Sequence, residues 1–105
     1  MVTIASFRQL ALSFPGTEEK PHFERKAFRI KKGIFVTLLE EKQQACVKLS
    51  LIEQSVFCAF DKDIIYPVNN KWGQQGWTVI ELKKVKKGML KDALTVAYTE
   101  MSNKK

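Results

Sequence analysis

The sequence predicts an α+β fold with two layers, an antiparallel sheet of about five strands with helices packed on one face, in the order α-β-β-β-α-β-β-α. Two observations lead to this prediction. Apolar residues recur at helical spacing near both ends of the chain, and three strand-like segments with short connections lie between them. With 105 residues, of which 45% are apolar, residues 1–105 are expected to form a single domain with one core.

An N-terminal helix is predicted over about residues 3–14, with Thr3 as its cap. Its apolar stripe consists of Ile4, Phe7, Leu10, Ala11 and Phe14. Pro15 and Gly16 end the helix, because the residue before a proline avoids helical angles. The polar residues 17–24, which include Pro21, are expected to form a loop or a sheet edge.

Three consecutive segments carry a strand pattern. Residues 26–31 alternate, with Phe28 and Ile30 facing inward. Residues 34–39 are β-branched and aromatic, which is typical of a central strand that is covered on both faces. Residues 44–49 form the third strand, and the short connections between the three favour an antiparallel meander.

A second helix is predicted from a capping box. The Ser50 hydroxyl accepts from the Glu53 backbone N–H, and the Glu53 carboxylate reaches back to Ser50. The helix is expected to continue to about Phe60 and to end at residues 61–63. The residues expected on its buried stripe are Ile52, Val56, Ala59 and Phe60.

The segment from Tyr66 to Trp77 has no clear helical or strand period. It contains both tryptophans, two glycines and several side-chain amides. A short extended piece at residues 64–66 precedes it, and a strand is predicted over residues 77–82. An irregular loop with this many aromatic groups either fills a core or presents a surface, so its Trp72 is a candidate contact residue.

The chain closes with a basic connection at residues 83–88 and a helix from Met89 to about Met101. Residues 102–105 are expected to form a frayed tail. The apolar side of the closing helix consists of Leu90, Ala93, Leu94, Ala97, Tyr98 and Met101.

The net charge of +7 is unevenly distributed. Residues 20–32 carry six Lys or Arg and one Glu, and residues 71–91 carry six Lys and one Glu. Such clusters are typical of proteins that bind polyanions, although a solvated surface that keeps a small protein soluble has the same composition. Convergence of the two basic segments on one face of the fold would favour a nucleic-acid site, and positions on opposite sides would disfavour it.

The sequence offers no catalytic or metal-binding constellation. His22 is the single histidine, and Cys46 and Cys58 lie apart inside apolar segments, which predicts reduced, buried thiols. We therefore expect no enzyme activity, no cofactor and no metal. The chain lacks a run of about 18 apolar residues, and its first residues do not form a signal peptide, so a cytoplasmic location without a membrane partner is expected.

Three parts of the sequence resemble the MmcQ/YjbR-like family. They are residues 26–38, the segment from Tyr66 to Thr78 with its Lys71-Trp72-Gly73-x-x-Gly76-Trp77-Thr78 run, and the closing helix with Leu90, Leu94 and Tyr98. The resemblance covers nearly the whole chain. It implies a compact α+β fold, also described as a double wing, with likeness to secretion chaperones and frataxin-like sheets. It further implies DNA binding, with no catalytic residues to transfer.

Nucleic-acid binding, to DNA or RNA, is the leading functional hypothesis. Lysine and arginine neutralise phosphates, and an exposed tryptophan stacks on a base. The candidate nucleic-acid-binding residues are Arg29, Lys31, Lys32, Lys71, Trp72, Lys83, Lys84, Lys86 and Lys87.

Two alternatives belong to other classes. The likeness to secretion chaperones implies a protein-interaction module, in which a sheet face or edge receives a peptide or a second copy of the chain. The other alternative is a small-ligand pocket under the loop, lined by Tyr66, Trp72 and Trp77.

Overall fold

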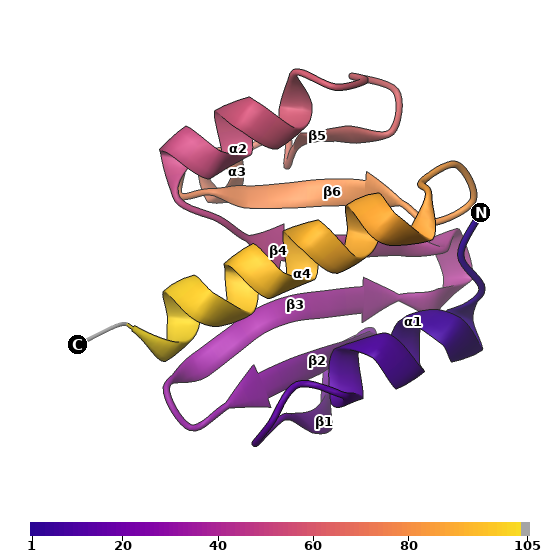
Figure 1. Ribbon diagram of the computed structural model, residues 1–105, viewed down its shortest axis with the longest axis vertical. Coiled ribbons are helices and arrows are strands. Elements are labelled where there is room, and N and C mark those ends of the chain that lie inside the picture. The colour runs from indigo at the N-terminus through magenta and orange to yellow at the C-terminus, as the bar shows by residue number, and fades with distance from the viewer. Residues whose placement is uncertain (104–105) are drawn as a thin grey trace.

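The computed structural model describes residues 1–103, so Lys104 and Lys105 of the expected tail lie outside it. The elements in chain order are α1 (Ile4–Leu12), β1 (Glu18–His22), β2 (Arg25–Ile30), β3 (Gly33–Leu39), the 3-10 turn η1 (Glu40–Lys42), β4 (Gln44–Lys48), α2 (Leu51–Cys58), β5 (Ile65–Pro67), α3 (Lys71–Gln74), β6 (Trp77–Glu81) and α4 (Lys87–Ser102). The strands form one sheet in the order β1-β2-β3-β4-β6-β5, and every neighbouring pair is antiparallel (Figure 1). The α+β prediction is confirmed, with six strands in place of about five.

The additional strand is β1, in the polar segment that was expected to be a loop or an edge. It forms the outer strand of the sheet, which is where a proline such as Pro21 is tolerated. The guanidinium of Arg8 on α1 fixes β1 from the other layer. Its Nε lies 2.8 Å from the Glu19 carboxylate, and its Nη2 lies 2.9 Å from that of Glu40.

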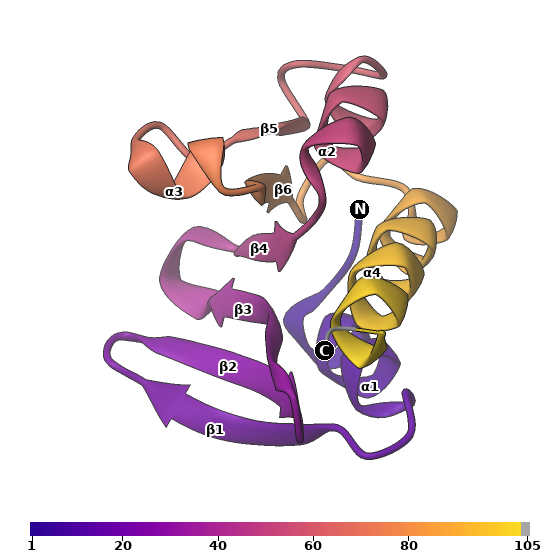
Figure 2. The ribbon, with the colours of Figure 1, turned by 90° about the vertical axis from the view of Figure 1, so that its left-hand side faces the viewer.

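Helices α1, α2 and α4 cover one face of the sheet, whereas the single turn α3 lies on the opposite side (Figure 2). The apolar residues predicted for the first and last helices pack against the sheet or each other, although α1 ends at Leu12, so the predicted stripe residue Phe14 lies just beyond it. Phe7 meets Phe28 edge to face with 5.5 Å between ring centroids, and Phe14 stacks on Tyr98 at 4.9 Å. The largest fully buried side chains include Phe7, Phe28, Phe35, Leu38, Ile80, Leu90 and Leu94.

The buried stripe predicted for α2 is wrong. Ile52, Val56 and Phe60 are 79%, 52% and 67% exposed, and Ala59 is also exposed. The helix instead turns Phe57 and the amide of Gln54 inward. The apolar period shows that the helix has such a stripe, but not which side of the helix faces the sheet.

One half of the predicted capping box is present. The Ser50 hydroxyl accepts from the Glu53 N–H at 3.2 Å, as expected. The Ser50 N–H, however, donates to the carboxylate of Glu100 on α4 at 2.9 Å, so the reciprocal role predicted for Glu53 is wrong. The tertiary contact replaces the local one and joins the ends of two helices.

Candidate ligand-binding groove

The face of the sheet opposite the long helices is built from small and polar side chains. Directly paired residues on neighbouring antiparallel strands share a face, so the register defines a row across the whole sheet. That row consists of Lys20, Ala27, Thr37, Cys46, Val79 and Tyr66. Of the helices, only the short α3 lies on this side, which leaves the centre of the face uncovered by helices within residues 1–103 (Figure 2).

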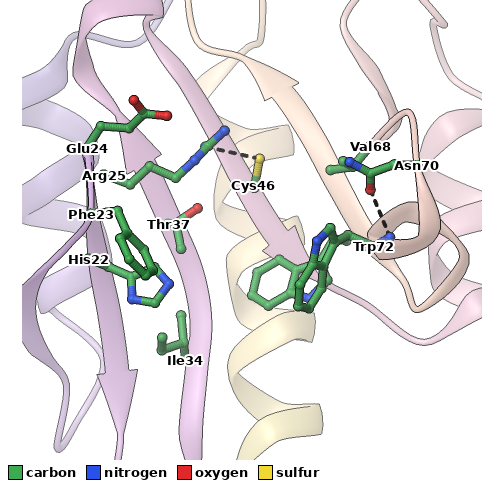
Figure 3. A pocket seen from close by; sticks show the side chains of 11 residues that line it. His22, Phe23, Glu24, Arg25, Ile34, Thr37, Cys46, Val68, Asn70 and Trp72 are labelled. Atoms are coloured by element: carbon green, nitrogen blue, oxygen red, sulfur yellow. Dashed lines mark hydrogen bonds between the residues drawn. The ribbon is translucent and has the colours of Figure 1, made fainter.

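Two segments rise from this face and enclose a groove of about 450 Å³. The β1–β2 hairpin and α3 project from the same side at opposite ends of the sheet, with β3 and β4 between them (Figure 2). Figure 3 shows the lining: His22, Phe23, Glu24 and Arg25 from the hairpin, Ile34, Thr37 and Cys46 from the floor, and Val68, Asn70 and Trp72 from the other wall. Trp77, the first residue of β6, also lines the groove.

The floor of the groove is held by a polar contact. Arg25 extends from β2 over β3 to β4, where its Nη1 donates to the Cys46 Sγ at 3.6 Å. Burial raises the pKa of the Cys46 thiol, which keeps it protonated and unsuited to act as a nucleophile. Cys58 is only half-buried, where a buried thiol was expected, and neither cysteine is in a disulfide.

Phe23 forms the tip of the hairpin wall and is unusual in two respects. Its side chain is 95% exposed, although it is a large aromatic group. Its φ is 59°, at the first central position of a two-residue hairpin loop, where glycine is preferred. A bulky residue with positive φ costs conformational energy, and such strain is concentrated at functional positions.

The opposite wall is anchored firmly. The Asn70 Oδ1 accepts from the Trp72 N–H at 2.8 Å and starts α3. A Cβ at Gly73 would lie 1.9 Å from the Val68 carbonyl oxygen, and one at Gly76, with φ 104°, would lie 1.8 Å from that of Leu49. Gly73 and Gly76 therefore allow the backbone to pack closely, which a side chain at either position would prevent. The wall holds Trp72, which remains 50% exposed, in a fixed position beside the groove.

A hydrogen-bonded group lies at the β6–β5 end of the same face. The Tyr66 hydroxyl donates to the Glu81 carboxylate, and the Gln44 Nε2 donates to the same carboxylate at 2.9 Å. Burial and the bond to Glu81 raise the pKa of Tyr66 to about 12, so it stays a neutral donor. Of the three residues predicted to line a pocket under the loop, Trp72 and Trp77 line the groove, and Tyr66 lies outside it.

The predicted nucleic-acid-binding residues lie in three separate places. Arg29, Lys31 and Lys32 lie at the end of β2 and in the β2–β3 turn; Lys71 and Trp72 lie on α3; Lys83, Lys84, Lys86 and Lys87 lie between β6 and the start of α4. The β2–β3 turn is near the C-terminal end of α4, since Gly33 lies beside Met101, whereas the Lys83–Lys87 segment leads into its N-terminal end (Figure 1). The 16-residue helix separates them by about 24 Å.

The structure therefore does not bring the β2–β3 turn and the Lys83–Lys87 segment together. Of the nine predicted residues, Trp72 lines the groove, and Arg29 lies on the open face because it pairs with Ile34 of the floor. The sequence alone did not identify Phe23, Arg25, Ile34 and Thr37 as site residues. The available signal was Phe23 itself, a large apolar residue within the polar segment 17–24.

Within residues 1–103, no group of three or more His, Cys, Asp or Glu side chains is placed to hold a metal ion. None of the described helices has the length and apolar character needed to cross a membrane.

Comparison with known proteins supports the fold and the family. The family model YjbR matches residues 12–100. The crystal structure of the Deinococcus radiodurans protein DR2400, with family-model domain DUF419, is similar with a TM-score of 0.84 and 18% identity, over 99% of this chain and 81% of that chain. None of the curated proteins matches. Because the family model spans most of its length, the chain belongs to the YjbR family.

Proposed function

We propose that this protein binds single-stranded nucleic acid in the groove on the open face of the sheet, in a non-catalytic role. The observation that carries the proposal is the exposed aromatic ring on each side of the groove, Phe23 on the hairpin and Trp72 on α3. Aromatic rings exposed beside a groove are the means by which proteins stack unpaired bases. The strained backbone of Phe23 supports a role for its ring outside the fold.

The charge around the groove suits a phosphate backbone. Arg25 lines the floor, and the register places Lys20 and Arg29 on the same face. Lys71 is exposed next to Trp72 on α3. The nearby carboxylates of Glu18 and Glu24 reduce this excess, so few phosphates are neutralised. We therefore expect moderate affinity with a shallow dependence on salt.

The dimensions of the groove favour single strands over duplex. Its 450 Å³ lies within the range of about 300–1,000 Å³ that is usual for small-ligand pockets, which is enough for a planar base. In a duplex the base faces are stacked on one another, so Phe23 and Trp72 would find no free face without unstacking the helix.

The test is a titration of a fluorescent single-stranded oligothymidylate of about eight nucleotides, at about 50 mM salt, followed by anisotropy. The wild-type protein is expected to bind it more tightly than a duplex of the same length. Trp72→Ala and Phe23→Gly should each weaken binding about tenfold, since stacking on one aromatic side chain contributes about 1–3 kcal/mol.

Phe23→Gly separates binding from folding. Glycine adopts φ 59° without strain, so this variant should be at least as stable as the wild type while it binds less. The matched control reverses the charges of Lys83, Lys84, Lys86 and Lys87. If the groove is the site, this change leaves binding within about threefold, apart from a general effect of net charge.

Two results would contradict the groove as a nucleic-acid site. One is the absence of detectable binding by the wild type at about 50 mM salt, where phosphate contacts are strongest. The other is binding that survives Phe23→Gly and Trp72→Ala but is lost with the four lysines, which would assign it to the β6–α4 segment.

A further inference from the structure

The outward side of α2 carries a continuous apolar surface, the outer α2 face. Ile52, Val56 and Phe60 follow one another at intervals of four along and just beyond the helix, so they lie in one row. Leu51 is also exposed and adjoins this row at its start. A single exposed apolar residue needs no explanation, but a contiguous row marks an interaction surface.

This orientation is a fixed feature of the fold. Phe57 is buried, and the Gln54 Nε2 donates to the carbonyl oxygens of Gly73 at 2.9 Å and Trp77 at 3.2 Å. Turning the helix to bury Ile52 and Val56 would break both hydrogen bonds. The outer α2 face is therefore held in one orientation by these contacts, which lowers the entropic cost of binding a partner.

The centre of the outer α2 face suits close packing against another helix. Ser55 and Ala59 are exposed, small and lie beside the apolar row, so they leave grooves between its ridges. The charged groups of this region, Glu53, Asp61, Lys62 and Asp63, lie outside the row. On the rim they remain hydrated and contribute little to a contact.

We infer that the outer α2 face pairs with the same face of a second copy of this chain, as a symmetric dimer in which the two α2 helices cross. A row with spacing of four packs into the equivalent row of an identical helix, and a twofold axis closes that contact. In an antiparallel crossing, Lys62 of one copy approaches Glu53 of the other copy and attracts it. Asp61 and Asp63, which flank Lys62, repel the same Glu53.

The available area is that of a modest interface. The four apolar side chains expose on the order of 400 Å² per copy, the size of the largest patch on a typical monomer. Two such patches, together with their polar rims, would bury about 1,200 Å² of total surface, which is the lower end of the range for stable protein–protein interfaces. We therefore expect a dissociation constant on the order of 100 µM.

Salt should strengthen this dimer. Each copy carries a net charge of +7, and the repulsion between two copies is screened as ionic strength rises. Binding of nucleic acid in the groove responds in the opposite way, because salt weakens phosphate contacts. The two associations are thus distinguishable, and the dimer does not depend on the groove.

The experiment is sedimentation equilibrium from about 10 µM to 1 mM protein, at about 0.05 and 0.5 M salt. The wild type should shift from monomer to dimer within this range, and at lower protein concentration in the higher salt. Replacing both Ile52 and Val56 by Lys should weaken dimerisation at least about tenfold.

The control replaces Leu12, which is exposed on α1 outside the outer α2 face, by Lys; it adds charge and should keep most of the dimerisation. Circular dichroism confirms that each variant is folded. A wild-type protein that stays monomeric at about 1 mM in high salt overturns the inference. So does a dimer that the Ile52 and Val56 substitutions leave unchanged.

Discussion

Helices α2 and α4 lie on the same side of the sheet but turn their apolar stripes in opposite directions. α4 buries Leu90, Ala93, Leu94 and Ala97 against the sheet. α2 exposes its most apolar residues and buries Phe57 and an amide. Both helices have apolar residues at helical spacing, so the pattern alone does not distinguish them.

The difference follows from what each helix covers. α4 crosses the centre of the sheet over β3 and β4, where only apolar side chains can fill the space between the layers. α2 packs beside the three-residue strand β5, next to the Gly73 and Trp77 carbonyl oxygens, which accept from Gln54 as well as from backbone N–H groups. The two hydrogen bonds of the Gln54 amide fix the rotation of α2 and turn the apolar row toward solvent.

The largest expected loss of stability comes from a substitution in α4. Leu94 is fully buried, and Leu94→Ala should lower the free energy of unfolding by about 3 kcal/mol through lost burial and a cavity. Val56→Ala on α2 should change it by less than about 0.5 kcal/mol, because Val56 is exposed in the monomer. Urea unfolding followed by circular dichroism measures both changes.

The protein concentration must be low enough to keep the chain monomeric, since a dimer through the outer α2 face would add its own stabilisation to the wild type. A loss for Val56→Ala that equals the loss for Leu94→Ala would show that Val56 is buried in the monomer, and the contrast between the two helices would fail.

Gln54→Leu tests the polar contact that orients α2. Leucine is similar in size but removes both hydrogen bonds, at a cost of about 2 kcal/mol for the pair, although each carbonyl oxygen keeps a backbone donor. Gln9→Leu on the exposed side of α1 is the matched control and should be near neutral. If Gln54→Leu is stabilising, apolar packing is sufficient to hold α2 and the amide does not determine its rotation.

Local sequence signals predicted most of the fold. The stripes of α1 and α4, the meander β2–β4 and the Ser50 cap depend on neighbouring residues, and all are present. The sequence predicts only a loop or an edge at β1 because Glu18, Glu19 and Lys20 show no apolar alternation. Its strand conformation comes from pairing with β2 and from the Arg8–Glu19 ion pair, both of which are tertiary.

The groove was less predictable than the fold. Trp72 and Trp77 were visible as aromatic residues in an irregular loop, but their partners across the groove were not. Phe23 lies 49 positions before Trp72, and only the strand order places the two walls on the same side of the sheet. The basic residues 29–32 and 83–87 showed the reverse: the two groups look alike in the sequence but lie near opposite ends of α4.

The smallest expected effect comes from substitutions at the N-terminal caps of α2 and α4. Ser50→Ala removes the hydroxyl that accepts from Glu53 and should cost about 1 kcal/mol. The backbone N–H of residue 50 still donates to Glu100, so the substitution isolates the cap. α4 begins after Lys86, which makes no side-chain cap, and Lys86→Ala should be near neutral. A helix with two buried residues relies on its cap, whereas α4 is held by its buried stripe; equal losses from the two substitutions would contradict this distinction.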